Sequence, residues 1–276
     1  MPGRQHRPRE SWITRGGIAA LGAAVILMID GLLAFGLLRD RTYQLDSAVE
    51  RLEAEARAFE IHTRRSLAAY DELLLALRDR VRMGASPSGL ITLMLDLTRH
   101  MPQVLGLVVT DADGAVTVAT LDVPVTGGPS SPFAVHRDGE GPGLLIGGPM
   151  PSEGGEGDRL IIPLSRRVDD GRGRFLGVVA LVLDLERLTA GYGELIDIRY
   201  GRMTVALGDG TSLVRIPPGP PDLPDAAAVG GEVLTARSYI RDLPDGSRHL
   251  VSEQRVTGLP VTISVTDCLL YTSRRG

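Results

Sequence analysis

The sequence predicts an α+β protein: an N-terminal transmembrane helix, a long helix, and two antiparallel-sheet modules in tandem. Three features of the 276 residues indicate this: an apolar run at 16–38, a heptad pattern within 43–83, and an order of hairpin and strands that occurs twice. A hydrophobic content of 43% is typical of a folded chain. The net charge of −4 gives no reason to expect a nucleic-acid partner.

The apolar run at 16–38 is interrupted only by Asp30. About 20 residues, each rising about 1.5 Å along a helix, span the hydrocarbon core of a bilayer. The run is longer than the core of a typical signal peptide, although Ala34-Phe35-Gly36 faintly resembles a cleavage site. We therefore expect a retained anchor, with a cleaved leader as the alternative.

Flanking charges predict the orientation of this anchor. Residues 1–15 carry four arginines against Glu10, and positive flanks stay in the cytoplasm. Arg39, Arg41 and Arg51 follow the run and weaken the bias. The chain has no lysine and is rich in Gly and Ala, which suggests a GC-rich bacterial genome. We expect a cytoplasmic tail at 1–15, a span of the bacterial inner membrane at 16–38, and the rest in the periplasm.

A second helix is predicted at 43–83, because no Pro or Gly occurs there and apolar residues alternate four and three apart. The seam has a polar interruption at Thr63 and Ser66. Its second half is expected to pack on its own domain. Its first half could pair with a second copy, which would make a homodimer. The seam residues are Leu45, Val49, Leu52, Ala56, Phe59, Thr63, Ser66, Tyr70, Leu73 and Leu77.

The remaining pattern predicts two related modules. The first has a helix at 90–100 capped by Ser86 or Ser88, a hairpin around a turn at 111–114, strands at 144–146, 159–166 and 175–183, and a helix at 185–195. The second has a hairpin around a turn at 208–210, a proline-rich segment at 217–231, and strands at 238–242, 249–255 and 261–265. Asp111, Asp113 and Asp209 are interpreted as turn residues, not metal ligands.

Several segments resemble the bacterial double Cache sensor (also called PDC), whose modules are PAS-like. They include Val104-Leu105-Gly106-Leu107-Val108-Val109-Thr110-Asp111, Ile162-Pro163-Leu164-Ser165-Arg166-Arg167 and Gly258-Leu259-Pro260-Val261. The resemblance extends over about 43–266. The most similar members are the subgroup of these sensor domains that is found on diguanylate cyclases and sensor histidine kinases. It implies a membrane-distal module at 43–195, including the long helix, and a membrane-proximal module at 196–266.

The resemblance implies the sensing region of a membrane-bound signal transduction receptor. It would bind a small extracytoplasmic ligand and signal to a missing cytoplasmic histidine kinase or diguanylate cyclase. Alternatives are the sensing region of a chemoreceptor and a complete membrane-anchored periplasmic binding module. An anchored enzyme is disfavoured because no nucleophile with a spaced base occurs. No catalytic residue and no cofactor are expected. The single cysteine, Cys268, leaves no thiolate cluster for a zinc site, so no metal site is expected either.

Candidate ligand-binding residues lie in the first module. Phe133, His136 and Arg137 belong to a short segment expected to cover the sheet, and Arg166 and Arg167 lie on a strand whose alternation sends one inward. A guanidinium suits carboxylate or phosphate, so Phe133, His136, Arg137 and Arg166 form a predicted pocket for a small anion. The alternative is a salt bridge of Arg166 with Asp138 or Asp169.

Two departures from the family pattern bear on the ligand. The segment around His136 lacks the Tyr and Trp of the amino-acid-binding pattern, which makes an amino-acid ligand doubtful. In the second module, residues 217–229 are short for a pocket helix, so that module is expected to hold no ligand.

The C-terminal end resembles the translation of a transposase adapter used in DNA sequencing, in the residues Cys268-Leu269-Leu270-Tyr271-Thr272-Ser273. On this interpretation 268–276 are non-native and the natural sequence continues differently after Asp267, with a second membrane helix and an output domain. The alternative is an ordinary tail.

Overall fold

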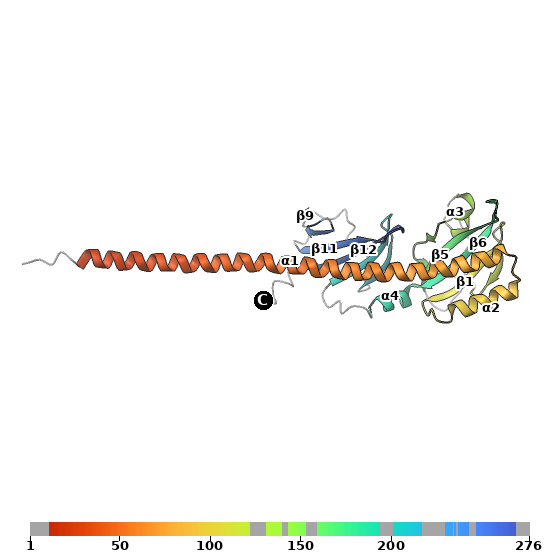
Figure 1. The fold of residues 1–276 in the computed structure, drawn as a ribbon, viewed down its shortest axis with the longest axis horizontal. Helices are drawn as coiled ribbons and strands as arrows, with labels where there is room; N and C mark the ends of the chain where they lie inside the picture. Colours follow the sequence, from red (N-terminus) through yellow and green to blue (C-terminus); the bar gives the residue numbers. More distant parts are fainter. Residues whose placement is uncertain are drawn as a thin grey trace, which may run out of the picture. The chain divides into compact units, whose positions relative to one another are not determined.

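The computed structural model describes residues 11–121, 131–139, 143–152, 159–193, 201–216, 230–233, 235, 237–242 and 247–268. These residues form one long helix, three shorter helices and two antiparallel sheets, which confirms the predicted α+β class (Figure 1). The chain divides into two compact units, Met1–Arg51 and Leu52–Gly276. We describe each unit by itself.

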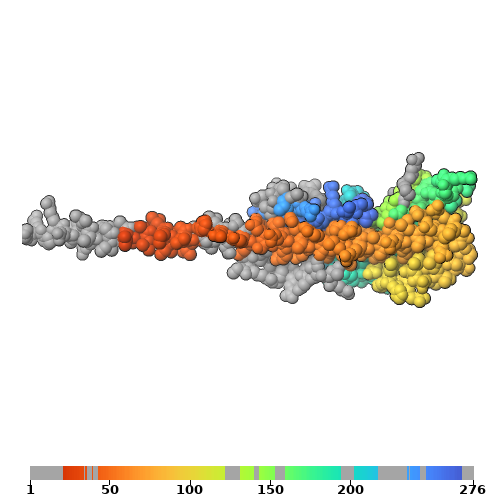
Figure 2. Space-filling model, viewed as in Figure 1, coloured from red at the N-terminus to blue at the C-terminus, as the bar shows by residue number. Residues whose placement is uncertain are grey.

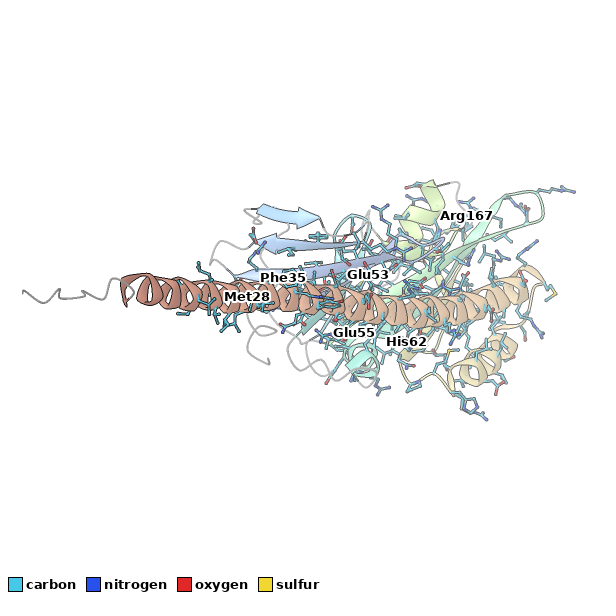
Figure 3. All side chains as sticks on the ribbon, turned by 60° about the vertical axis from the view of Figure 1, so that its left-hand side comes forward. Met28, Phe35, Glu53, Glu55, His62 and Arg167 are labelled. Atoms are coloured by element: carbon cyan, nitrogen blue, oxygen red, sulfur yellow. The ribbon has the colours of Figure 1, made fainter. Side chains whose placement is uncertain are left out.

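The helix α1 runs without a break over Ser11–Arg82 and so belongs to both units. Two separate helices were predicted at 16–38 and 43–83. They are continuous because the residues between them include neither Pro nor Gly. In the first unit, large apolar side chains of α1 are exposed, among them Met28 and Phe35, both labelled in Figure 3. Among the described residues, none of the helices combines the length and the hydropathy that a bilayer crossing requires.

In the second unit, the heptad seam of α1 is buried by the protein's own sheets. Leu52, Ala56 and Phe59 are buried, as are Leu73 and Leu77 further along. The chain itself therefore covers the seam from Leu52 onward. This part includes much of the first half of the predicted helix at 43–83, the half that could pair with a second copy.

The first sheet has the strand order β2-β1-β6-β5-β3, with β4 also paired to β5. The central strand β6 is buried from residue 177 to its end, as its uninterrupted apolar sequence predicts. The two-residue strands β3 and β4 pair with successive parts of β5, and β4 had no counterpart in the sequence prediction. The strands are β1 (Val104–Thr110), β2 (Val116–Ala119), β3 (Leu145–Ile146), β4 (Met150–Pro151), β5 (Leu160–Asp169) and β6 (Phe175–Asp184).

Three short helices accompany this sheet. The helix α2 (Pro87–Thr98) packs on β1 and β2, and α3 (Pro132–Asp138) packs on β5 and β6. The helix α4 (Leu185–Gly193) follows β6 directly and packs on β8 of the second sheet as well as on the first. Side-chain oxygens cap their N-termini: Ser86 Oγ accepts from the Gly89 amide in α2, and Asp184 Oδ1 accepts from the Arg187 amide in α4.

The second sheet has the order β8-β7-β12-β11-β10-β9 and is antiparallel throughout. Its face toward α1 is apolar, with Met203, Val205, Ile263 and Val265 buried. The edge strand β9 was not predicted, because residues 217–231 were interpreted as loop. The strands are β7 (Gly201–Leu207), β8 (Ser212–Ile216), β9 (Gly230–Val233), β10 (Ser238–Asp242), β11 (Arg248–Arg255) and β12 (Val261–Cys268).

Aspartates close the first hairpin of each sheet, as predicted. Asp111 Oδ1 accepts from the amides of Asp113 and Ala115, and Asp209 Oδ1 accepts from the amide of Thr211. The glycine that follows in each turn has a positive φ, +88° at Gly114 and +87° at Gly210. These carboxylates are therefore turn-forming groups.

Two sequence predictions fall largely outside the described residues. They are the proline-rich segment at 217–229 and the proposed non-native tail at 268–276, of which only Cys268 is described. The strand β12 continues through Asp267 to Cys268, which pairs with His249 of β11.

Candidate functional site

The helix α3 places two predicted site residues against the first sheet. Ser131 caps the helix by accepting a hydrogen bond from the Ala134 amide, and Pro132 occupies its first turn. This start turns Phe133 and His136 toward the sheet, where both are buried. The prediction that a short helical segment carries these residues is therefore confirmed.

His136 is only 4% exposed and its Nε2 lies 3.0 Å from the Ser165 hydroxyl on β5. Burial lowers the pKa of His136, and the nearby charges of Arg167 and Arg166 lower it further. The imidazole is therefore neutral near pH 7. In that state it joins α3 to the sheet through one hydrogen bond with a hydroxyl that can donate or accept.

Arg167, on the same face of β5 as Ser165, holds the C-terminal end of α3. Its Nη1 donates to the carbonyl of His136 and, over 3.1 Å, to that of Gly139, while its Nε donates to Asp169 over 2.6 Å. The guanidinium lies 4.6 Å from the ring centroid of Phe175, and Figure 3 labels Arg167 on this strand. A cation at a helix C-terminus is electrostatically favourable, so Arg167 stabilises α3.

Arg166 extends from the opposite face of β5 and pairs with Asp71 of α1. Its Nη2 donates to Asp71 Oδ2 over 2.8 Å, and its Nε donates to Oδ1 of the same carboxylate. The predicted salt bridge therefore exists, but with Asp71 in place of Asp138 or Asp169. Alternation along the strand puts one arginine on each face of the sheet.

Arg137 points away from the sheet. Its side chain is about half exposed and donates to both oxygens of Asp138, with its guanidinium 5.6 Å from the Phe133 ring centroid. The structure thus brings His136 and Phe133 together on the α3 face of the sheet. It leaves Arg137 at the surface and Arg166 on the other face.

Two further side chains of α1 bind the rest of the second unit. Glu53 Oε1 accepts from the hydroxyls of Thr235, over 2.6 Å, and Ser238, over 2.8 Å, next to β10. These hydrogen bonds, that of Thr235 first, lower the pKa of Glu53. Ten residues later, the buried Thr63 hydroxyl lies 2.8 Å from the Tyr192 hydroxyl on α4. Glu53, Thr63 and Asp71 are called the α1 tethers below.

A small apolar cavity of about 30 Å³ lies at the central α1 tether, between the two sheets. It is too small and too apolar to hold a polar ligand. Its walls come from α1, both sheets and α4, so it marks the place where these elements meet. The lining residues include Thr63, Tyr70, Leu164, Leu183, Tyr192 and Val214.

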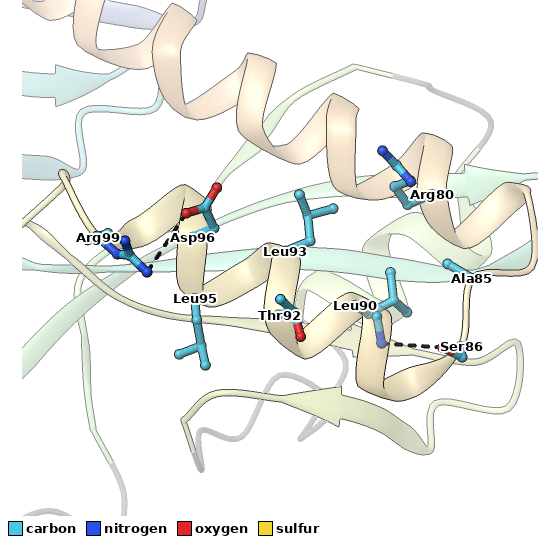
Figure 4. A pocket seen from close by; sticks show the side chains of 10 residues that line it. Arg80, Ala85, Ser86, Leu90, Thr92, Leu93, Leu95, Asp96 and Arg99 are labelled. Atoms are coloured by element: carbon cyan, nitrogen blue, oxygen red, sulfur yellow. Dashed lines mark hydrogen bonds and ion pairs between the residues drawn. The ribbon is translucent and has the colours of Figure 1, made fainter.

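An open groove of about 580 Å³ lies between the end of α1 and α2, which lie side by side at the surface (Figures 2 and 4). Arg80 stands on one side and Arg99, 3.9 Å from Asp96, on the other. Leu95 is exposed in its wall. Within the ranges that the structure describes, no cluster of His, Cys, Asp and Glu has a metal-binding arrangement.

Sequence reasoning missed Asp71, Glu53 and Tyr192. Asp71 and Glu53 lie outside the predicted seam, and Tyr192 belongs to no motif. A usable signal existed for Asp71: a half-buried arginine at 166 requires a carboxylate, and Asp71 follows the seam residue Tyr70 directly.

Solved structures that resemble this chain include an extracellular domain of a histidine kinase and ligand-binding domains of chemoreceptors. The extracellular domain of a protein described as a histidine kinase matches with a TM-score of 0.65 and 21% identity, covering 84% of this chain and 99% of that one. The ligand-binding domain of the Pseudomonas fluorescens chemoreceptor CtaA, in complex with L-isoleucine, matches with a TM-score of 0.65 and 17% identity, covering 85% and 98%.

The amino-acid chemoreceptor PctC of Pseudomonas aeruginosa PAO1, in complex with GABA, matches with a TM-score of 0.60 and 20% identity, covering 80% of this chain and 99% of that one. No protein-family model and no curated protein sequence matches the chain. The chain has the fold of double Cache-type sensor domains, as the sequence resemblance implied.

Proposed function

We propose that this chain is the sensing region of a membrane-bound receptor whose first module binds a small extracytoplasmic ligand. The observation that carries the proposal is the fold: two antiparallel sheets packed along one helix, as in ligand-binding domains of histidine kinases and chemoreceptors. Fold alone does not define a site. Residues of α3 and β5 support the position of the site.

The ligand is placed on the α3 face of the first sheet, next to Phe133, His136 and Arg137. On this face the neutral imidazole of His136, the Ser165 hydroxyl and the Arg167 guanidinium hold α3 to the sheet, and the guanidinium of Arg137 is about half exposed. A guanidinium can bind a carboxylate or phosphate through charge-assisted hydrogen bonds, so Arg137 is the proposed contact for the ligand. We assign Arg166, which was predicted to contact the ligand, to the coupling of this face with α1.

The coupling follows from the alternation of β5. Ser165 and Arg167 contact α3 on one face, and Arg166 between them contacts Asp71 of α1 on the other. A ligand that shifts α3 therefore also biases the strand that holds α1. Signalling would be a population shift between two packings of α1 on the sheets, read out by the helix.

The ligand proposal is tested by thermal unfolding of the full chain in detergent with acetate, succinate, inorganic phosphate, GABA and L-isoleucine. A ligand at about 100 times its Kd stabilises the folded state by roughly 2.7 kcal/mol. Arg137→Gln should weaken the response while leaving the fold intact, because Arg137 is at the surface. The matched control is Arg174→Gln, since Arg174 is an exposed arginine of the β5–β6 turn. The proposed site would be contradicted if Arg174→Gln reduced ligand binding and Arg137→Gln left it unchanged.

The membrane part of the proposal places 16–38 in the inner membrane with the modules in the periplasm. Its support is the apolar run and the exposed apolar side chains on that part of α1, including Leu27, Leu32 and Phe35. Alkaline phosphatase fused after Thr266 should be active in cells, and a cytoplasmic reporter fused there should be inactive. The reverse pattern would contradict this topology.

The output is proposed to be a histidine kinase or a diguanylate cyclase encoded after Thr266, with a homodimer through α1 as the signalling unit. A chemoreceptor output and a complete anchored binding module are the alternatives. Long-read sequencing of the source locus separates them, because each output domain has its own sequence. Light scattering of the full chain in detergent, corrected for the micelle, tests the dimer, and a monomer mass would contradict it.

A further inference from the structure

Three polar side chains interrupt the apolar face that the second sheet turns toward α1. Ser252 pairs with Val265 and Gln254 pairs with Ile263, so both share the face of these buried apolar residues. Ser238 of β10 pairs with Ser252 of β11 and lies on the same face. Both serines are fully buried, and Gln254 is only 8% exposed. We call Ser238, Ser252 and Gln254 the polar island.

The polar island is only partly hydrogen-bonded within the part of the chain that the structure describes. The Ser238 hydroxyl donates to Glu53 Oε1 of α1 over 2.8 Å. The Ser252 hydroxyl and the Gln254 side-chain nitrogen have no hydrogen-bond partner. A buried polar group without a partner is costly, and native interiors contain few of them. Two of them at neighbouring positions of one face therefore require a physical reason.

The carboxylate of Glu53 stands next to these two groups. Figure 3 labels Glu53 on α1, and it lies on the β10 side of the polar island, where the Thr235 hydroxyl donates to Oε1 over 2.6 Å. Directly opposite residues of antiparallel strands have Cβ atoms about 4.5–5.5 Å apart, so Ser252 lies one strand beyond Ser238. A displacement of α1 by one strand spacing, about 4.8 Å, from β10 toward β11 would carry the carboxylate over Ser252.

Each position of the carboxylate has its own support. On the β10 side, the hydrogen bonds from Thr235 and Ser238, and then the charge of Arg237, lower the pKa of Glu53. On the β11 side, the carboxylate would accept from Ser252 and Gln254, the two groups that have no partner in the described packing. Both positions offer several donors, so hydrogen bonding alone selects neither, and a small change elsewhere in the module can decide between them.

We propose that Glu53 is a two-position contact between α1 and the second sheet. In the first packing, which the structure describes, it accepts from Thr235 and Ser238. In the second packing, α1 is displaced toward β11 and Glu53 accepts from Ser238, Ser252 and Gln254. The inference rests on the proposed signalling by α1, and it names the contact that α1 exchanges in the second module. Ser252 and Gln254 are positioning residues of the second packing.

A double-mutant cycle of Thr235→Ala and Ser252→Ala tests the exchange of partners, with unfolding constants from urea unfolding of the full chain in detergent. Because Ser252 offers Glu53 a replacement donor, Thr235→Ala should lower the unfolding constant's stability ratio at least about tenfold more in the Ser252→Ala background than in the unmutated one. The Thr235 hydroxyl also accepts from the Arg237 and Ser238 amides, a loss common to both backgrounds that cancels in the cycle. The matched control is Ser264→Ala, on the opposite face of the sheet, which should be additive with Thr235→Ala.

Distances between two spin labels test the displacement of α1 itself. One label is attached at the exposed Ala58 of α1, and the other at the exposed Thr257 of the β11–β12 turn or, in a second pair, at the exposed Arg172 of the β5–β6 turn. The labels are introduced as cysteines in a Cys268→Ser background, because Cys268 is a free cysteine. In at least one pair, Thr235→Ala should enrich one distance population and Ser252→Ala the other.

The proposal is overturned if the cycle of Thr235→Ala and Ser252→Ala is additive, or if neither variant changes either label distance. Thr235→Val, which keeps the shape of the side chain, replaces Thr235→Ala if that variant fails to fold. No ligand is present in these experiments. Ligand binding that depends on Arg137 can therefore persist when the exchange fails, which separates this inference from the ligand site proposed on the first module.

Discussion

Replacing Tyr192 by Phe tests whether the central α1 tether holds α1 and α4 together. The hydroxyls of Tyr192 and Thr63 lie 2.8 Å apart, and both residues are buried, at 3% and 2% exposure. Burial raises the pKa of Tyr192 to about 12, so the phenol keeps its proton at neutral pH. The substitution removes one hydroxyl and leaves the ring in contact with those of Phe59 and His62.

The expected cost combines two effects. A typical intramolecular hydrogen bond contributes about 0.5–1.5 kcal/mol, and a buried hydroxyl left without a partner adds to that loss. Thr63 can turn its hydroxyl toward the carbonyl four residues earlier in α1, which limits the second effect. We therefore expect Tyr192→Phe to lower the free energy of unfolding by about 1–2 kcal/mol, and Thr63→Val to do the same.

A double-mutant cycle isolates the contact. Because the double variant leaves no unsatisfied hydroxyl, it should cost less than the sum of the single variants, with a coupling of about 1 kcal/mol. Urea unfolding followed by far-ultraviolet circular dichroism gives the four free energies. Full additivity, or single costs below about 0.3 kcal/mol, would show that the two hydroxyls do not interact.

Three further predictions concern the other tethers and α3. Asp71→Asn should lower the free energy of unfolding by about 1–3 kcal/mol, because it weakens the charged pair with the largely buried Arg166. Asp79→Asn, at an exposed i,i+3 pair with Arg82, should cost less than about 0.5 kcal/mol in the same urea assay. Equal costs would contradict the tether. The hydrogen bonds that lower the pKa of Glu53 stabilise the folded state above the unfolded pKa, and this stabilisation is lost as the pH falls through the folded pKa. In thermal unfolding, Glu53→Gln should therefore be less stable than the unmutated chain at pH 7 and approach it as the pH falls below the ordinary glutamate pKa of about 4.3. A difference in stability between the two chains that does not change with pH would contradict this. The lowered pKa of His136 makes protonation destabilising, so stability should fall as pH decreases below about 6.5, and His136→Gln should flatten that fall. An unchanged slope would show that His136 does not titrate as described.

Local patterns predicted most of the elements. The strands around β6 and β12 were predicted with small errors at their ends, because alternation, apolar runs and Asp-Gly turns act over a few residues. The strands β4 and β9 were missed. Met150–Pro151 is too short to show a period, and the glycines that begin β9 are typical of loops.

The candidate site was predicted only in part, because the missing information is tertiary. Alternation correctly separates Arg166 and Arg167 between two faces, yet it cannot say which face meets α3. The partner of Arg166 lies 95 residues away, on a helix whose charges otherwise look solvated. Glu53 shows the same limit, since its partners, Thr235 and Ser238, follow it by more than 180 residues.

The strand order of the second sheet has a consequence for how the protein is synthesised. The strand β12, last along the chain, lies between β7 and β11, so the β8-β7 pair and the β11-β10-β9 group are joined only through it. A ribosome that has not yet released β12 carries two unconnected pieces of sheet with unpaired edges. The first sheet, by contrast, is complete once β6 has emerged. Folding during translation therefore has an early and a late stage, and a message truncated before Val261 would release a chain whose unpaired edges favour aggregation.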